Sequence, residues 1–341
     1  MNRLAVSALP FLVATAAWSQ SFDVSENALK AHVSFLASDA LKGRNTPSPE
    51  LDISAEYIAA QFRRAGLEPA FGESFFQEGD ITNRRTQETG KAKNVGAILR
   101  GSDPTLAQTY IVVSAHYDHL GAREAVEGSD TIFNGANDDA SGVAGMLELA
   151  QVMGSHKPKR SIMFVGWYGE EKGLVGSRYF VQHPPVDLKQ IIANVNLEQI
   201  GRTDDSEGPH VAEANFTGFD FSDLPSVFQA ANDGQPFKFT KNEKNSDQYF
   251  FASDNASFAG VGIPAHTISV AYMFPDYHQV GDHWDKLDYA NLAKTTMAVA
   301  RGLNALANRS EVPQWNRELP KTKRYVDAYD KLMGGGLFHG L

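Results

Sequence analysis

Side chains of the types that bind metal ions recur in five short segments of this sequence, at residues 116–119, 134–139, 169–171, 196–198 and 277–278. Four of these segments lie at or after the end of a predicted strand, and residues 134–139 precede a predicted helix. In open α/β sheets ligands bind beyond the carboxyl ends of the strands, so these side chains are expected to meet at one edge of a sheet. Because the sequence contains no Cys, any metal ion must be bound by His, Asp and Glu.

Each of these residues also has an ordinary explanation when it is taken alone. A single histidine is more often structural than a ligand, and Asp138 and Asp139 could simply cap the helix that follows them. Glu198 could pair with Arg202, and adjacent glutamates in a loop are usually solvated. The expected convergence of all of them on one edge of one sheet favours a metal site.

The ligand set fits a pair of zinc ions. Two zinc ions in a catalytic site lie about 3.5–4 Å apart, share a bridging carboxylate and keep an open position for water. We expect His116 and Glu198 to bind one ion, Glu171 and His278 to bind the other, and Asp138 to be shared by both. The predicted cofactors are therefore two zinc ions.

Further carboxylates have predicted roles beside the metals. Glu170 is expected to act as the general base, which takes a proton from water and passes it to the leaving amine. Asp118, two residues after His116, is expected to accept the imidazole N–H and so to fix the tautomer of the ring. Asp282 is expected to support the region of His278 in a similar way.

The elements that must position these residues alternate between strands and helices. Strands are predicted at residues 94–99, 110–115, 161–168, 191–197 and 265–270. Helices are predicted at residues 25–42, 52–67, 141–153, 174–182, 221–232 and 289–307, with a loop containing Pro47 and Pro49 between the first two. This alternation predicts an α/β fold with a mostly parallel, mixed central sheet and helices on both faces. Residues 203–260 have no clear pattern and are expected to form loops over the site or surface.

The two ends of the chain are expected to lie outside the catalytic domain. Residues 1–19 have a basic start, an apolar run and small residues at the cleavage spacing, which is typical of a signal peptide. The apolar run is too short to span a bilayer, so the mature protein is expected to be free of the membrane and secreted or periplasmic. Residues 20–310 are predicted to form one domain with a helical lead-in at 25–67, followed by a C-terminal tail at 311–341.

The composition excludes several classes of function. The net charge is −10 and the few basic runs are short, which argues against binding of nucleic acid. Hydrophobic residues make up 42% of the chain, a value typical of a folded globular protein. The lack of Cys excludes disulfides, thiolate nucleophiles and thiolate-bound clusters.

The order and spacing of these motifs resemble the co-catalytic two-zinc exopeptidase family, which includes secreted bacterial leucyl aminopeptidases. The resemblance covers about residues 28–308. It rests on the His-x-Asp motif at 116–118, Asn-Gly-Ala-Asn-Asp-Asp-Ala-Ser-Gly at 134–142, Gly-Glu-Glu at 169–171, Asn-Leu-Glu at 196–198, and Tyr-His-x-x-x-Asp-x-x-Asp-Lys at 277–286.

The resemblance implies roles for these residues that agree with the assignment above. The family's zinc ligands correspond to His116, Asp138, Glu171, Glu198 and His278, and its general base corresponds to Glu170. Carboxylates behind the ligands correspond to Asp118 and Asp139, and the peptide bond between Asp138 and Asp139 is cis in characterised relatives. Tyr277 corresponds to a tyrosine that polarises the scissile carbonyl in some relatives, although simple packing explains it equally well.

Two positions depart from the family pattern. The ligand at Glu198 is usually Asp, and a histidine often found after Ser-Asp is replaced by Asn255. Neither change removes an expected donor.

The sequence therefore predicts an exported zinc aminopeptidase that removes N-terminal residues, with a preference for apolar ones, from peptide substrates. A metal-bridging hydroxide would attack the carbonyl, Glu170 would move the proton, and Glu170 and Glu198 would accept the substrate ammonium. Tyr272, Met273 and Phe274 are expected to form an apolar pocket near His278. The alternatives are a carboxypeptidase or dipeptidase, an acyltransferase resembling glutaminyl cyclases, and a non-catalytic binding module on the same fold.

Overall fold

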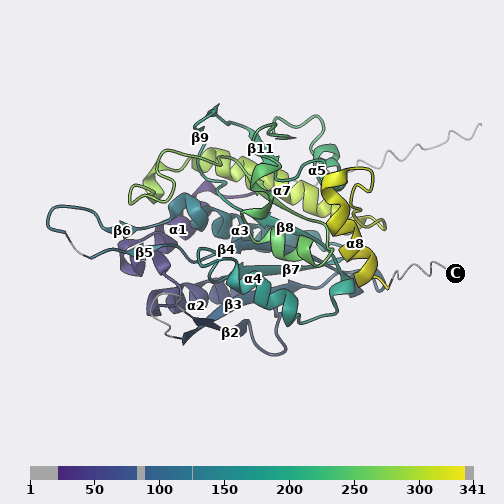
Figure 1. Ribbon diagram of the computed structural model, residues 1–341, viewed down its shortest axis with the longest axis horizontal. Helices are drawn as coiled ribbons and strands as arrows, with labels where there is room; N and C mark the ends of the chain where they lie inside the picture. Colours follow the sequence, from purple (N-terminus) through teal and green to yellow (C-terminus); the bar gives the residue numbers. More distant parts are fainter. Residues whose placement is uncertain (1–21, 83–88, 125, 335–341) are drawn as a thin grey trace, which may run out of the picture.

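A nine-stranded mixed sheet forms the centre of the computed structural model, which describes residues 22–82, 89–124 and 126–334 (Figure 1). The strand order is β1-β3-β7-β4-β8-β13-β11-β12, and β2 pairs with β3. The strands are β1 (Glu68–Pro69), β2 (Phe76–Thr82), β3 (Thr89–Leu99), β4 (Tyr110–His116), β7 (Ser161–Trp167), β8 (Ile191–Leu197), β11 (Glu213–Phe216), β12 (Lys238–Thr240) and β13 (Ala265–Ser269). Two small hairpins pair β5 (Gly121–Ala122) with β6 (Ile132–Phe133) and β9 (Asp204–Asp205) with β10 (Gly208–Pro209).

The centre of the sheet is parallel and completely buried. β7, β4, β8 and β13 run in the same direction, and every residue of these four strands is buried. Strands covered on both faces need apolar residues along their whole length, which explains runs such as Tyr110–Ala115. The outer strands β3 and β11 are antiparallel to their inner neighbours. The predicted mixed α/β sheet is therefore confirmed.

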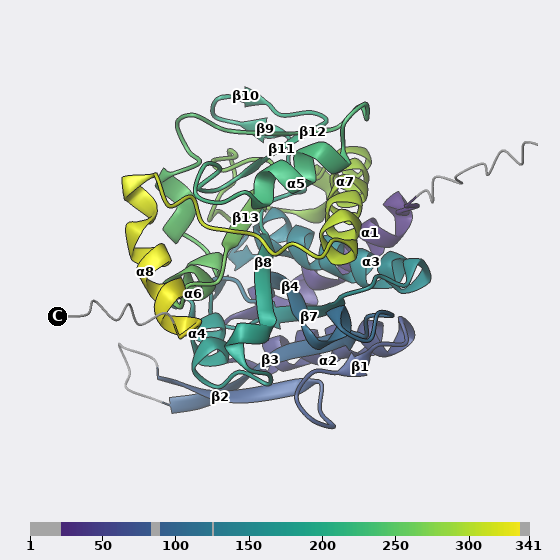
Figure 2. The same cartoon turned by 90° about the vertical axis from the view of Figure 1, so that its right-hand side faces the viewer.

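Helices cover both faces of the sheet, and each face has its own hydrophobic core (Figure 2). The helices of the larger core are α1 (Glu26–Leu36), α2 (Pro49–Arg64), α3 (Ser141–His156), α5 (Leu224–Ala231) and α7 (Tyr289–Asn308). The helices of the smaller core are α4 (Val175–Gln182), α6 (Asn255–Gly260) and α8 (Lys323–Leu332). The parallel strands are thereby held between two helical layers, and their carboxyl ends meet at one edge.

The N-terminal helices differ from the prediction in their bounds. The first α-helix ends at Leu36 rather than at residue 42, and a 3₁₀ segment (Asp39–Arg44) follows it. The side chain of Arg44 donates to the carbonyl of Leu36, and Asn134 donates to that of Ala37 at 2.9 Å. These distant residues satisfy the last carbonyls of α1, so the apolar period beyond residue 36 does not continue the helix.

The second helix begins three residues earlier than predicted. Ser48 accepts a hydrogen bond from the N–H of Leu51, and Pro49 is the first helical residue rather than part of a loop. Proline is well suited to this position, because its missing N–H would have no partner within the helix.

Several elements were not predicted, and most of them lie in the second half of the chain. They are the strands β1, β2, β5, β6, β9, β10, β11 and β12 and the helices α6 and α8. Within the segment expected to be a C-terminal tail, Trp315 and Tyr325 are buried in the smaller core and α8 contacts α6. This part of the expected tail is therefore packed on the sheet.

Other predictions concern the surface and the ends of the chain. Residues 1–19, predicted to be a signal peptide, lie outside the described residues, as do residues 335–341. Among the helices of the described residues, none is both long and apolar enough to cross a bilayer.

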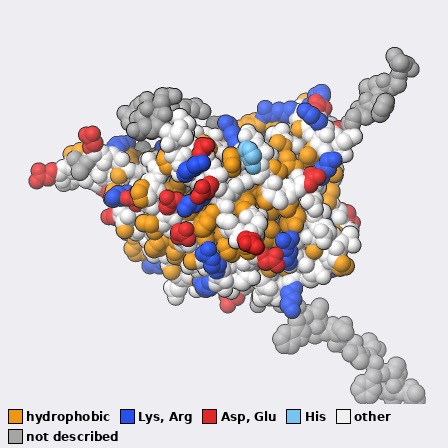
Figure 3. All heavy atoms as spheres, turned by 90° about the horizontal axis from the view of Figure 1, so that it is seen from below, with side chains coloured by type: hydrophobic (Ala, Val, Ile, Leu, Met, Phe, Trp, Pro, Cys, Tyr) orange, Lys and Arg blue, Asp and Glu red, His pale blue; other side chains and the backbone are white. Residues whose placement is uncertain are grey.

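On the face seen in Figure 3, Lys and Arg side chains are scattered between acidic and hydrophobic ones, and the coloured residues form no continuous basic patch. That nucleic acid is not a partner stays a prediction.

Candidate metal centre

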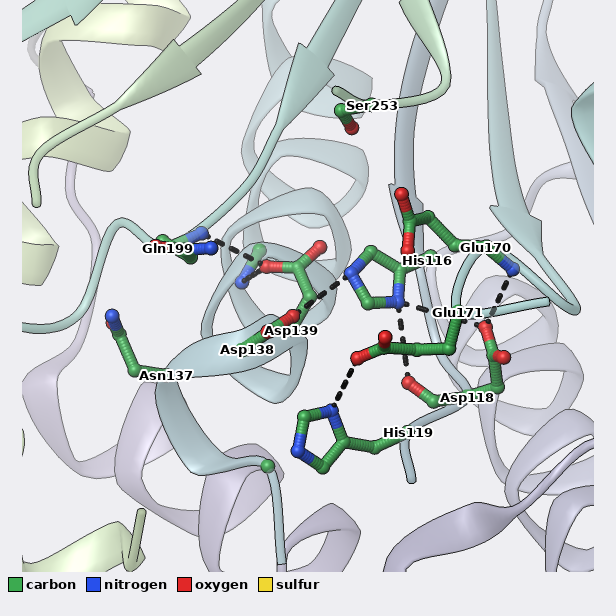
Figure 4. A network of polar contacts seen from close by, with 12 residues as sticks. His116, Asp118, His119, Asn137, Asp138, Asp139, Glu170, Glu171, Gln199 and Ser253 are labelled. Atoms are coloured by element: carbon green, nitrogen blue, oxygen red, sulfur yellow. Dashed lines mark hydrogen bonds and ion pairs between the residues drawn. The ribbon is translucent and has the colours of Figure 1, made fainter. Parts of the chain in front are cut away.

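The five predicted metal ligands come from separate elements and meet at the carboxyl edge of the parallel strands. Figure 4 labels three of them, His116, Asp138 and Glu171. His116 is the last residue of β4, Glu171 follows β7, and Glu198 follows β8. Asp138 lies in the turn Ala136–Ala140 before α3, and His278 lies in the loop after β13. Because β7, β4 and β8 are parallel neighbours, the residues after them lie on the same side.

Asp138 lies between two histidines. Its Oδ1 atom is 3.0 Å from Nε2 of His116, and its Oδ2 atom is 3.1 Å from Nε2 of His278. The peptide bond from Asp138 to Asp139 is cis, as the resemblance implies. The carboxylate thus presents one oxygen to each of two groups of ligands.

The first group consists of His116, Asp138 and Glu198. One ligand atom from each of these residues lies within 4.8 Å of the others. The other ring nitrogen of His116, Nδ1, is 3.2 Å from the backbone carbonyl of Asp118 and 3.6 Å from its carboxylate. The backbone carbonyl, rather than the predicted side chain, is therefore the nearer partner of this nitrogen.

The second group contains one histidine that was not predicted. His278 Nε2 is 3.3 Å from Oε1 of Glu171, and Nδ1 of His119 is 2.8 Å from the same oxygen. His119, Asp138 and Glu171 also present ligand atoms within 4.8 Å of one another. His119 was assigned no role from the sequence, although it ends the same short segment as His116.

The donors of both groups have the properties of metal ligands. Several buried polar atoms in them form no hydrogen bond with any described residue, namely Nε2 of His116, both ring nitrogens of His119, Oε1 of Glu171 and Oε2 of Glu198. Buried polar atoms are normally paired, so unpaired ones that face each other indicate a missing partner. Imidazole nitrogens and carboxylate oxygens are ligands that zinc accepts. The donor set therefore fits zinc.

The pKa values of the glutamates in the site are shifted in opposite directions. Burial, together with the neighbouring carboxylates, raises the pKa of Glu198 to about 8 and the pKa of Glu170 well above its usual range. Burial and Asp138 also oppose ionisation of Glu171, but its contacts with His119 and His278 lower its pKa to about 2. Closely packed acids thus raise each other's pKa unless a cation or a histidine stands beside them.

The carboxylates behind the ligands hold the backbone in place. Asp118 accepts hydrogen bonds from the N–H of Glu170 at 3.1 Å and from Thr46 Oγ1 at 2.9 Å. Asp139 accepts from the N–H groups of Gly142 at 3.0 Å and Gln199 at 3.2 Å. These bonds fix the turns that carry the predicted base and ligands.

Asp282 acts on a different segment from the one predicted. Its carboxylate accepts hydrogen bonds from the backbone N–H of Asn137 at 3.0 Å and of Asp138 at 3.1 Å. It therefore supports the turn of Asp138 rather than the region of His278. The sequence could not reveal this, because the two segments are far apart along the chain.

Arg202 supports the loop of His278 and does not pair with Glu198. Its guanidinium contacts Asp204 at 2.6 Å and Asp276 at 3.0 Å, and its backbone N–H donates to Asn137 Oδ1 at 2.8 Å. Arg202 therefore connects the end of β8, the turn of Asp138 and the loop that ends at His278.

A cavity of about 440 Å³ opens beside the metal centre. Tyr277 lines this cavity, and its ring stacks on that of His278 with a centroid distance of 4.0 Å. Of the three residues expected to form an apolar pocket, only Tyr272 lines the cavity among the described residues. Phe274 is buried outside the cavity lining, and the centre of its ring is 5.4 Å from Cζ of Arg202. Met273 is exposed.

Several proteins resemble this chain in sequence or in fold. A probable zinc metalloprotease from Pyrenophora tritici-repentis is 30% identical over 199 residues, which cover 56% of this chain and 44% of that protein. This chain therefore spans less than half the length of that relative. A zinc aminopeptidase from Bacillus subtilis has a similar fold, with a TM-score of 0.68 and 16% identity over 86% of this chain and 98% of that one.

A protein with a different activity has a comparable fold. A glutaminyl cyclase from Porphyromonas gingivalis matches with a TM-score of 0.63 and 19% identity, over 83% of this chain and 98% of the other. Similarity at this level identifies the fold and does not separate the two activities. The sequence match to a family is more specific. Residues 94–303, more than half of the chain, match peptidase family M28, and this protein therefore belongs to that family.

Proposed function

We propose that this chain is a zinc-dependent aminopeptidase that uses two zinc ions. The position of Asp138 carries this proposal, because its two carboxylate oxygens face His116 and His278 at 3.0 and 3.1 Å. A carboxylate shared between two ligand groups is the feature that distinguishes a two-metal site from a single-metal one. The family membership and the aminopeptidase with a similar fold support the same conclusion.

His116 and Glu198 would hold one ion, Glu171 and His278 the other, and Asp138 both. When bound, the zinc ions supply a Lewis acid for the scissile carbonyl and activate the attacking water. Zinc also favours ionised carboxylates, which offsets the crowding that raises the pKa of Glu198.

Glu170 would move the proton during hydrolysis. Its backbone N–H is held by Asp118 at 3.1 Å, so its place beside the ligands is fixed. A buried carboxylate with a raised pKa can accept a proton from water and return it to the leaving amine. One residue would thus act first as base and then as acid.

The cavity would bind the N-terminal residue of a peptide. Glu170 and Glu198 would accept the α-ammonium group, and the hydroxyl of Tyr277 would donate to the scissile carbonyl. Tyr249 and Tyr272, whose stacked rings lie 5.1 Å apart, line the cavity and would favour an apolar side chain. Export of the protein, as the apolar run at residues 4–17 predicts, would place this activity in the periplasm or outside the cell.

Replacement of the general base tests this proposal. Glu170→Gln should lower kcat for an apolar aminoacyl amide by at least about 100-fold, because general acid–base catalysis contributes roughly 10²–10⁴-fold. Elemental analysis should find two zinc ions per chain in the variant and in the wild type. Glu318→Gln, a substitution of an exposed glutamate, serves as the matched control and should retain activity. Full turnover by Glu170→Gln would refute the role of Glu170.

The similar fold of a glutaminyl cyclase supports an acyltransferase as the second candidate function. A peptide with an N-terminal glutamine separates the two activities, because a cyclase releases ammonia from it and an aminopeptidase releases free glutamine. Peptides with blocked N-termini separate both activities from that of a carboxypeptidase, because only a carboxypeptidase would hydrolyse them. A binding module without catalysis is disfavoured, because each expected ligand position carries a donor.

A further inference from the structure

Charge is distributed unevenly around the cavity beside the metal centre. Asp138, Glu170, Glu171 and Glu198 contribute four carboxylates to its lining. Among the described lining residues, Arg178 is the single Lys or Arg. A cavity with acids at the metals and one guanidinium elsewhere is suited to a ligand that carries both charges.

Arg178 lies on α4, which begins at Val175, five residues after the predicted base. The N–H of Leu174 donates to the carbonyl of Glu170 at 2.9 Å, and the N–H of Arg178 donates to that of Leu174 at 3.1 Å. The chain turns sharply between Glu170 and α4, with positive φ at Gly173 and Leu174, and the N–H of Val175 donates to the carbonyl of Gly169 at 3.0 Å, so α4 begins beside the loop of Glu170. Because side chains on a helix lean toward its N-terminus, the stem of Arg178 leans toward the start of α4, which lies beside the loop of Glu170.

The guanidinium of Arg178 has no partner among the described residues. It forms no hydrogen bond, ion pair or contact with an aromatic ring there, whereas every other described arginine has at least one of these. Arg202, Arg309 and Arg317, for example, each contact a carboxylate. Arg178 is also exposed, so a ligand in the cavity can reach it.

The size of the cavity limits what can lie between the metals and Arg178. A volume of about 440 Å³ is at the lower end of the roughly 300–1,000 Å³ of small-molecule sites. An extended peptide advances about 3.3–3.6 Å per residue, so one or two residues beyond the scissile bond cover about 3–7 Å. Because Arg178 lines the same cavity as Glu170, a peptide that extends from the metals by this distance would approach its side chain.

We propose that Arg178 binds a carboxylate of the peptide substrate, one or two residues after the scissile bond. A guanidinium forms two parallel hydrogen bonds with a carboxylate, which gives both attraction and orientation. The carboxylate is the C-terminus of a dipeptide or tripeptide, or an acidic side chain in a longer peptide. The inference rests on the proposed aminopeptidase function and deepens it, because it names short or acidic peptides as preferred substrates.

Matched peptide pairs test this inference. The wild-type enzyme should hydrolyse Leu-Ala and Leu-Ala-Ala with a kcat/KM about tenfold higher than their C-terminal amides, the modest size expected for an exposed charge pair. In Arg178→Gln this ratio of acid to amide should fall to about one, and Arg178→Lys should keep part of it. Arg64→Gln, which changes an exposed arginine on α2 away from the cavity, should keep the wild-type ratio.

Leu-Glu amide identifies the source of the carboxylate, since it has an acidic side chain and no free C-terminus. Faster hydrolysis of Leu-Glu amide than of Leu-Gln amide, lost in Arg178→Gln, would assign the site to acidic side chains. A preference confined to free C-termini would assign it to short peptides. An unchanged acid-to-amide ratio in Arg178→Gln would overturn the inference and leave the aminopeptidase proposal intact. If the wild type hydrolysed none of these peptides, both would fail.

Discussion

Two fully buried histidines, His116 at the end of β4 and His266 in β13, have opposite surroundings. His266 has a partner at each nitrogen, with Nε2 2.6 Å from Ser222 Oγ and Nδ1 2.7 Å from the carbonyl of Thr217. Nε2 of His116 forms no hydrogen bond with a described residue and faces Asp138. Burial alone therefore does not distinguish a site histidine from a structural one.

The pKa values of the two rings follow this difference. Burial opposes protonation of both, and it lowers the pKa of His266 to about 4, since no carboxylate of the described residues contacts that ring. At His116 the carboxylates of Asp118 and Asp138 outweigh burial and raise the pKa well above its usual value. A buried histidine with paired nitrogens and no acids is part of the core. One with an unpaired nitrogen among acids is a candidate ligand.

The largest effect should come from the same substitution at both histidines. His116→Leu should reduce zinc affinity and kcat/KM by more than the roughly 10- to 100-fold that loss of a residue supporting a ligand costs. His266→Leu should retain two zinc ions and lose about 1–3 kcal/mol of unfolding free energy, because Ser222 and Thr217 lose a buried partner. Zinc content by elemental analysis and unfolding in urea measure the two outcomes. Equal loss of zinc in both variants would contradict the assignment of His116 as a ligand and His266 as a structural residue.

A smaller effect is expected from a residue that holds a ligand in place. Arg202→Gln removes the ion pair with Asp276, two residues before His278, and leaves every predicted ligand intact. We expect the affinity for one zinc ion to fall by about 10- to 100-fold, with the other ion bound as before. Zinc titration with a competing chelator measures this.

Arg317→Gln serves as the control for Arg202, since it breaks an exposed pair with Asp330 far from the centre in sequence. Its zinc binding should equal that of the wild type. Equal weakening of both ions in Arg202→Gln would show that Arg202 stabilises the whole site rather than the loop of His278.

The smallest effect concerns the dependence of stability on pH. The pKa of His266 is about 4 when the protein is folded and near its usual value of 6.5 when unfolded, so the unfolded chain binds more protons between these values. The contribution of His266 to stability is present above pH 6.5 and is lost as the pH falls toward 4. Between pH 7 and pH 5 the loss should be about 2 kcal/mol.

His266→Leu isolates this contribution from that of the many carboxylates. The wild type should lose about 2 kcal/mol more than the variant between pH 7 and pH 5, in unfolding experiments with zinc removed from both. Parallel pH profiles of the two proteins would contradict the assignment of His266 as a buried neutral ring.

The spacing of apolar residues along the sequence correctly predicted the long helices and the buried strands. The buried strands β4, β7 and β8 and the long helices α3 and α7 lie within a few residues of their predicted bounds, because strand and helix periods are read from neighbouring residues. The short strands β11 and β12 at one side of the sheet and the helix α8 were missed. Their residues become apolar partners only when distant segments, such as Trp315 with Tyr325, pack together.

The sequence by itself determined the ligand types, their order along the chain and the edge at which they would meet, since each follows from motifs at strand ends. Tertiary structure alone decided that His119 joins the second ligand group, that Asp282 holds the turn of Asp138, and that Arg202 holds the loop of His278. The physical reason is distance. A hydrogen bond or ion pair requires atoms about 3 Å apart, and only the folded chain brings residues more than 50 positions apart in sequence to that separation.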